Sequence, residues 1–187
     1  MAYKIKTQPT VEPVTLTEAK AHLAIDHTFD DTYVTSLITA ARQQAENYLA
    51  QQLCTATWEL HLDKFENVIN ISKSPLVSID SIKYTDTDGN EQTLDTANYI
   101  LDKIRKPARL VPAYNKTWPS TQEIPNAVCI TFTSGYGVAA DVPQVIKSAI
   151  LLIIGHLYEN RGDEGHRTIP QTVWRLLDVY SIIFFDE

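Results

Sequence analysis

The chain has 187 residues, of which 44% are hydrophobic and 21% are charged, and its formal net charge is −7. This composition suits one folded domain, or a domain with a sizeable insert, and it argues against disorder. A protein that binds nucleic acid by neutralising phosphates usually carries an excess of basic residues. The acidic net charge therefore argues against a nucleic-acid-binding protein of this kind.

The N-terminal residues lack an apolar signal core. The longest apolar run, residues 149–154, is far shorter than the roughly 20 residues that cross a bilayer. We therefore expect a soluble protein, made in the cytoplasm, with no membrane contact. The two cysteines, Cys54 and Cys129, are too far apart for a C-x-x-C motif. Two buried, reduced thiols are the favoured interpretation, and a disulfide between them is the alternative.

The N-terminal segment is expected to be extended and then to enter a short helix. Prolines at positions 9 and 13 oppose a helix over residues 1–14. Thr15 and Glu18 match a capping box, which predicts that a helix begins directly after Thr15.

A second, longer helix is predicted from a cap at Asp30 or Asp31 to about Gln52, because apolar residues recur there at steps of three and four. The apolar positions are Val34, Leu37, Ile38, Ala41, Ala45, Tyr48 and Leu49. The positions expected on the opposite, polar face are Thr35, Thr39, Arg42, Gln43, Glu46 and Asn47.

The hydrophobic period then changes from helical to two, which predicts β structure. Residues 56–63 alternate between apolar and polar side chains, and residues 128–132 alternate in the same way. Further short strands are expected over residues 68–72, 78–85, 91–94 and 99–102. Asp-Gly within residues 86–90 predicts a tight hairpin turn. Residues 103–126 hold four prolines and are expected to be irregular.

Residues 142–162 predict a helix that is apolar over most of its circumference, which is typical of burial on nearly every side. Pro143 suits the first position of this helix. The positive charge of Arg161 is favourable near the negative C-terminal end of the helix dipole, and Gly162 is placed to cap the helix. A final short helix is expected to open at Pro170, with Val173, Trp174, Leu176, Leu177 and Tyr180 as its apolar positions. The tail at residues 182–185 is apolar enough to require packing on the domain or on a neighbour.

The order of elements predicts an α+β fold. It consists of a small helical core of about four helices, with an antiparallel β block inserted between helices two and three. We divide the chain into residues 1–54, residues 55–137 and residues 138–187. The first part holds an N-terminal extension and helices one and two, the second is the inserted β block, and the third holds the apolar core helix and the C-terminal docking helix and tail.

The sequence offers no catalytic constellation and no cofactor motif, so we expect a protein that is not an enzyme and holds neither metal nor cofactor. The weak alternative is a metal-dependent hydrolase using His156, Glu159 and His166, but H-E-x-x-H is absent. A basic cluster of Lys103, Arg105, Lys106 and Arg109 could contact phosphate or carboxylates. A solvated loop face is the favoured interpretation of that cluster.

Several motifs, in their order and spacing, resemble the head–tail connector proteins of tailed bacteriophages, also called adaptor or head-completion proteins. The motifs lie in residues 13–23, 30–31, 57–60, 74–79, 107–110, 118–119, 128–137, 142–143, 156–161 and 173–180. Each motif is weak alone, and together they run nearly from end to end.

The resemblance implies a structural protein, without enzymatic activity, that joins the head to the neck or tail of a tailed phage or prophage. It implies a ring of about twelve copies of the chain below the portal, extending a channel through which DNA passes without sequence-specific binding. The portal protein and a neck or tail completion protein would be its partners. The virion head–tail junction would be its location, after assembly in the host cytoplasm. A tail-side completion protein is the alternative within the same biology.

The same resemblance implies that helix two, the apolar helix and the C-terminal helix and tail supply subunit or partner contacts. The residues expected to make them are Val34, Leu37, Ile150, Ile153, Ile154, Tyr158, Arg161, Val173, Trp174, Leu177, Tyr180, Ile183, Phe184 and Phe185.

Overall fold

A computed structural model of the chain describes residues 1–161 and 168–181. The chain forms two compact units, which we describe separately. The β unit contains Met1–Pro9 and Thr55–Gly135, and the helical unit contains Thr10–Cys54 and the chain from Tyr136 onward. Within the β unit, residues 2–7 pair with residues 57–61 of the inserted β block.

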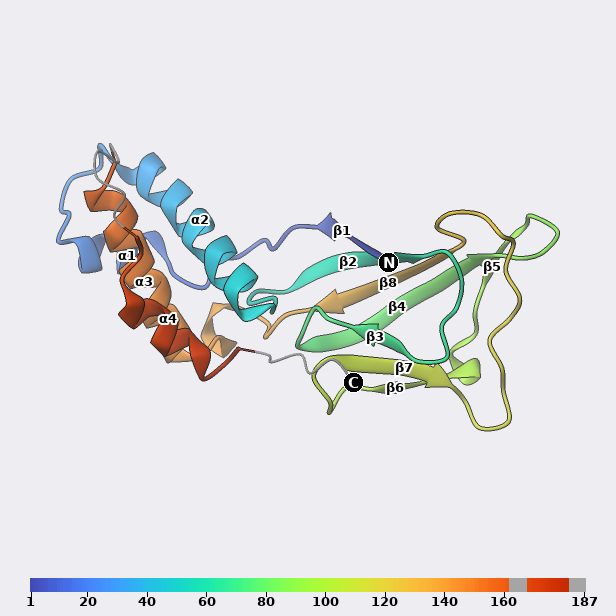
Figure 1. Ribbon diagram of the computed structural model, residues 1–187. Helices are drawn as coiled ribbons and strands as arrows, with labels where there is room; N and C mark the ends of the chain where they lie inside the picture. Colours follow the sequence, from blue (N-terminus) through green and yellow to red (C-terminus); the bar gives the residue numbers. More distant parts are fainter. Residues whose placement is uncertain (162–167, 182–187) are drawn as a thin grey trace. The chain divides into compact units, whose positions relative to one another are not determined.

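Among its described residues, the helical unit contains the expected four helices, and the β block separates the second from the third (Figure 1). They are α1 (Leu16–Leu23), α2 (Asp31–Leu49), α3 (Gln144–Glu159) and α4 (Gln171–Asp178), with a 3₁₀ turn, η2 (Ala139–Asp141), before α3. α3 packs against each of the other three helices. The α+β class and the position of the insert are therefore confirmed.

The predicted start of α1 is confirmed in atomic detail. The hydroxyl of Thr15 accepts a hydrogen bond from the backbone N–H of Glu18 at 3.2 Å. The carboxylate of Glu18 in turn accepts one from the backbone N–H of Thr15 at 2.7 Å. These two bonds satisfy N–H groups that the first turn of any helix leaves without an intrahelical partner.

α3 is less enclosed than its composition predicted. One face is buried, through Ile146, Ala149, Ile150, Ile153 and Ile154, none of which is exposed. Val145 and Leu152 lie seven residues apart on the other side, and each is 37% exposed. Two helical turns separate these positions, so α3 presents an apolar outer stripe.

Arg42 was expected on the polar outer face of α2, but it is only 4% exposed. The segment before α1 covers it, and the Nε of Arg42 donates to the carboxylate of Glu12 at 2.7 Å. Its Nη1 donates to Glu46, one turn further along α2, also at 2.7 Å. Glu46 also accepts from the backbone N–H of Leu53 at 3.0 Å. A buried charge network thus holds the segments flanking α1 and α2 onto α2.

The β unit is built on a five-stranded antiparallel sheet in the order β1-β2-β8-β4-β5 (Figure 1). The strands are β1 (Ala2–Thr7), β2 (Ala56–Leu62), β4 (Leu76–Thr85), β5 (Glu91–Thr93) and β8 (Val128–Ser134). β8 is central and pairs with β2 and β4, although it comes last in the chain. The turn between β4 and β5 is the predicted hairpin, and Gly89 has a φ of 86° there.

A second, three-stranded sheet has the order β3-β7-β6, with β3 (Ile69–Ile71), β6 (Tyr99–Asp102) and β7 (Ala108–Pro112). A short 3₁₀ turn, η1 (Thr96–Asn98), precedes β6. β7 lies within the segment predicted to be irregular. Pro107 and Pro112 obscured it, but they stand just before the strand and at its last position, where proline is tolerated.

The two sheets share one hydrophobic core. Leu60 of β2, Ile130 and Phe132 of β8, Ile69 of β3 and Leu110 of β7 are all fully buried in it. Because side chains alternate along a strand, the residues between these positions on β2 and β8 lie on the opposite face of the five-stranded sheet. Over residues 1–161 and 168–181, no helix is both long enough and apolar enough to cross a membrane.

The buried charge network predicts a large cost when its cation is removed. In Arg42→Met, the carboxyl groups of Glu12 and Glu46 lose the cation that offsets their burial, so we expect the free energy of unfolding of the helical unit to fall by about 3–5 kcal/mol. Urea denaturation followed by circular dichroism measures this loss. Adding Glu46→Gln to Arg42→Met removes one of the two carboxyl groups left without a cation and should recover part of the stability. A loss below about 1 kcal/mol in the single variant would show that the network contributes little.

Candidate interaction surfaces and a polar cluster on the sheet

Half of the residues predicted to contact a neighbour lie inside the helical unit. Their exposed fractions are between 0% and 8%, so they form the core of the unit and present no surface to a partner. These residues are Val34, Leu37, Ile150, Ile153, Ile154, Val173 and Leu177. The periodicity that identified them marks an apolar face, and tertiary packing buries that face within the chain.

Tyr158 and Arg161, also predicted contact residues, join the C-terminal end of α3 to the start of α2. Arg161 pairs with Asp30 at 3.0 Å, and the hydroxyl of Tyr158 donates to the same carboxylate at 2.6 Å. The guanidinium lies over the rings of Tyr33 and Tyr158, with 4.4 and 4.1 Å between its carbon and the ring centres. The cap predicted for Gly162 lies outside the described residues.

The electrostatics of this cluster favour the charged form of Asp30. Arg161 and then Tyr158 hold the pKa of Asp30 below its usual value. Asp30 stands at the N-cap position of α2, but its side chain makes no capping bond to the helix. Its carboxylate ties α3 to α2 instead.

α4 is attached to α2 by its apolar face and by polar contacts. The ring of Trp174 lies 4.6 Å from that of Tyr48, and the hydroxyl of Tyr48 donates to Asp178. The side chain of Gln51 donates to the backbone carbonyl of Tyr180. Trp174 and Tyr180 remain half-buried, so both can still reach a partner. The predicted contacts of Ile183, Phe184 and Phe185 lie outside the described residues.

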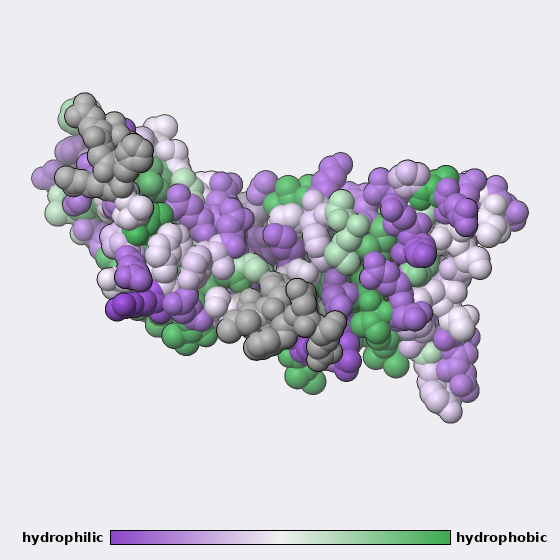
Figure 2. All heavy atoms as spheres, viewed as in Figure 1, coloured by the Kyte–Doolittle hydropathy of each residue, from purple (hydrophilic) through white to green (hydrophobic). Residues whose placement is uncertain are grey.

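Exposed apolar side chains are scattered over both units. Ile104, Phe29, Tyr114 and Val179 are 81–97% exposed. The face drawn in Figure 2 shows small hydrophobic patches separated by hydrophilic residues over both units. Surface of this kind offers separate apolar anchors for a partner.

In the basic cluster predicted over residues 103–109, Arg109 has a partner within its own hairpin and Lys103 has one on β4. Arg109 of β7 pairs with Asp102 of β6 at 2.9 Å, and the ammonium of Lys103 donates to the carbonyl of Val77 at 3.0 Å. Arg105 and Lys106 are exposed in the loop between the two strands. This arrangement fits the solvated loop face favoured from the sequence.

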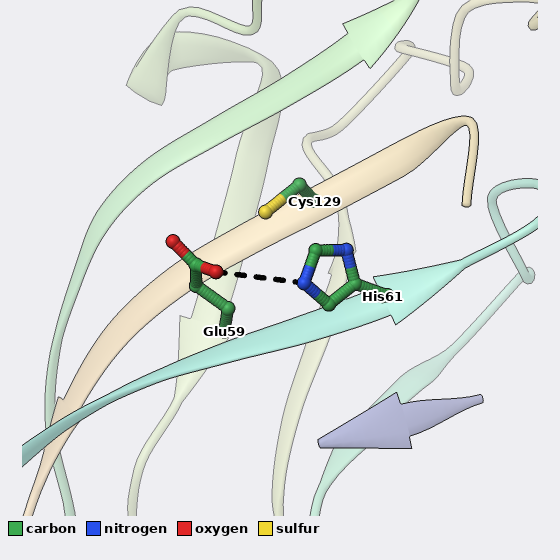
Figure 3. Close-up of side chains that lie close together, drawn as sticks. All are labelled: Glu59, His61 and Cys129. Carbon is green, nitrogen blue, oxygen red and sulfur yellow. Dashed lines mark ion pairs between the residues drawn. The ribbon is translucent and has the colours of Figure 1, made fainter. Parts of the chain in front are cut away.

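The outer face of the five-stranded sheet brings together three groups of different chemistry (Figure 3). Glu59 and His61 stand two residues apart on β2, and His61 is directly opposite Cys129 of β8. The Nε2 of His61 lies 3.5 Å from the Oε2 of Glu59. The carboxylate, imidazole and thiol atoms all lie within 4.8 Å of one another. Burial raises the pKa of the Cys129 thiol, and Glu59 adds to that effect.

This cluster could not be found from the sequence. The alternation predicted for both strands places all three side chains on polar faces, but the register that aligns the strands comes only from the sheet. Both cysteines are free thiols, and Cys54 is buried. In the alternative metal site considered from the sequence, which would use His156, Glu159 and His166, His166 lies outside the described residues. The ring of His156 lies beside the amide of Asn160, with 3.4 Å between their nitrogens.

Comparison with known proteins gives a family and a fold. The family described as "Phage gp6-like head-tail connector protein" matches residues 13–109. A chain in the neck of an empty gene transfer agent (GTA) particle, computed with C6 symmetry, matches this fold with a TM-score of 0.81 at 20% sequence identity. The match covers 99% of this chain and 97% of that chain.

Two further solved structures share the fold with the same coverage. One is from the virion of a native gene transfer agent particle, at 21% identity and a TM-score of 0.79. The other is from the neck of a native GTA particle computed with C12 symmetry, at 22% identity and a TM-score of 0.79. No curated protein matches the chain.

The Asp30 cluster predicts a defined acid sensitivity. Because the pKa of Asp30 is lowered on folding, its contribution is present above the usual value of 3.8 and is lost as the pH falls through the lower folded value. Asp30→Asn should therefore lower the melting temperature at neutral pH and flatten its decline in acid. Melting curves of the wild type, Asp30→Asn and the exposed control Asp26→Asn, recorded from neutral pH downward, test this. An acid decline of wild-type steepness in Asp30→Asn would contradict it.

Proposed function

Because this chain belongs to the phage gp6-like head–tail connector family, we propose that it forms a ring below the portal of a tailed phage or prophage. The observation that carries the proposal is the family match, which begins before α1 and extends into β7. The chain is therefore a structural head–tail connector rather than an enzyme. The hydrolase alternative has no support in this family.

The proposed ring has about twelve copies. The solved neck structures with this fold were computed with C6 and C12 symmetry, and a ring of twelve satisfies both. A closed ring needs heterologous contacts, in which one patch of each copy meets a different patch of the next. Each copy must therefore present two unlike surfaces.

The outer stripe of α3 is our candidate for one of these two surfaces. Val145 and Leu152 are partly exposed on it, while the opposite side of the helix is held in the core. An apolar stripe on a rigidly packed helix loses little conformational entropy when a neighbour covers it. This assignment replaces the buried residues that periodicity alone had indicated.

We assign portal docking to the C-terminal part of the chain, comprising the half-buried Trp174 and Tyr180 and the tail at residues 182–187. A neck or tail completion protein would bind elsewhere on the ring, and the ring would be located at the virion head–tail junction.

The acidic net charge suits a channel through which DNA slides. Basic groups bind DNA tightly because they release counterions from the phosphates, and a net negative charge disfavours such binding. A tail-side completion protein remains the alternative, and co-purification with portal or with tail-tube protein distinguishes the two.

Ring assembly is predicted to depend on Leu152. Leu152→Glu places a charge on the outer stripe, so assembly should require at least about tenfold more protein, as expected when a contact worth more than 1 kcal/mol is lost. Light scattering and negative-stain microscopy, with and without portal protein, measure assembly. Gln43→Glu adds the same charge to an exposed position of α2 and should assemble normally. Equal assembly of both variants would remove α3 from the interface.

Portal docking is predicted to depend on the last six residues. Removing residues 170–187 would also remove Val173 and Leu177 from the core, so that deletion cannot isolate docking. A chain that ends at Ser181 keeps every contact described above and loses only the tail. We expect it to keep the wild-type circular dichroism spectrum and to lose most of its co-purification with portal protein. Full portal binding by this shortened chain would exclude the tail as the docking element.

A further inference from the structure

The polar face of the five-stranded sheet brings together three side chains that carry metal-ligating atoms. Glu59, His61 and Cys129 converge there, on the side opposite the hydrophobic core (Figure 3). Leu60 and Ile130, their neighbours on the same strands, are fully buried. The buried neighbours anchor both strands, and β8 is held by hydrogen bonds on both sides. Sites on strands anchored in this way are held more rigidly than sites on loops.

The donor atoms suit a borderline metal ion. One carboxylate oxygen, one imidazole nitrogen and one thiolate sulfur make a mixed set, which zinc accepts readily. Calcium and magnesium prefer oxygen ligands alone, so this set disfavours them. With three protein ligands, a tetrahedral zinc ion keeps its fourth position for water or for an incoming group.

The spacing of the donor atoms is close to what zinc requires. Zinc-to-ligand bonds of 2.0–2.3 Å at tetrahedral angles imply about 3.3–3.6 Å between neighbouring donor atoms. The distance from Nε2 of His61 to Oε2 of Glu59 is already 3.5 Å. All three donor atoms lie within 4.8 Å of one another, so the proposed site requires side-chain rotations that bring them closer together.

The surrounding charges leave the required oxygen available. Lys6 binds Oε1 of Glu59 at 3.1 Å, while Oε2 faces His61. A hydrogen-bonded partner on the other oxygen orients the carboxylate, as outer-shell groups do in known metal sites. Lys83 is opposite Cys129 in the sheet, but its ammonium binds Glu91 at 2.7 Å.

We propose that Glu59, His61 and Cys129 form a three-ligand zinc site on the outer face of the β unit. The ion joins β2 to β8 beside their backbone hydrogen bonds, and its fourth position faces outward. Binding releases the thiol proton of Cys129 to solvent. The ion stabilises the β unit because the unfolded chain does not hold the three ligands together. This proposal does not rest on the connector role.

Calorimetric titration of the purified, chelator-treated chain with Zn²⁺ under reducing conditions tests the site. We expect one ion per chain, and affinities at least about tenfold weaker in His61→Ala and in Cys129→Ser. His27→Ala, which removes an exposed histidine of the helical unit, should bind as the wild type does. Circular dichroism without metal checks that each variant is folded. The absence of stoichiometric binding, or wild-type affinity in both ligand variants, would overturn the proposal.

Cobalt substitution gives a second readout that reports the ligand directly. A thiolate bound to Co²⁺ produces a near-ultraviolet charge-transfer band, which we expect in the wild type and in Cys54→Ser but not in Cys129→Ser. A band that persists in Cys129→Ser would overturn the assignment of the sulfur ligand. Portal binding is measured separately, so a chain that docks without zinc contradicts only this site. A chain that binds zinc but not portal contradicts only the proposed function.

Discussion

The insertion of a β block into a helical fold depends on one constraint, namely that the two ends of the block must be held together. The backbone N–H of Tyr136 donates to the carbonyl of Leu53 at 3.0 Å, and Cys54 forms a parallel bridge with Gly137. The hydroxyl of Tyr136 also donates to Gln51 at 2.8 Å. The chain therefore leaves the helical unit and returns to it at one place.

The same junction explains two local features of the sequence. Gly137 has a φ of 130°, a backbone conformation that favours glycine, and a Cβ at this position would also have to displace the carboxylate of Asp141. In the β unit, Ala56 at the start of β2 pairs with Ser134 at the end of β8. The first and last strands of the inserted block are thus neighbours. α2 and α3 can pack together although some ninety residues separate them, because the closed ends of the block reduce the entropy cost of joining them.

Function in such a connector depends on which apolar surface remains after the chain has folded. Most apolar residues of α2, α3 and α4 pack inside the helical unit. Among the described residues of these helices, Val145 and Leu152 on the outer stripe of α3 and Tyr48 on α2 stay partly exposed. The family identifies a connector, while its contacts must be sought among these residual surfaces. The polar face of the sheet carries the proposed zinc site, whose chemistry is independent of apolar packing.

The sequence by itself determined the elements whose cause is local. The capping box at Thr15, the helical periodicity of α2 and α3, the alternation of β2 and β8 and the Asp-Gly turn depend on neighbouring residues, so they could be predicted. The order of these elements was enough to predict the α+β class and the inserted block.

Only the tertiary structure decided what depends on partners distant in sequence. β7 is a strand because β3 and β6 flank it, and Arg42 is buried because Glu12 and Glu46 accept its hydrogen bonds. His61 meets Cys129 because the sheet register aligns two strands that are more than sixty residues apart. Periodicity states which face a side chain occupies, and long-range pairing then decides what that face contacts.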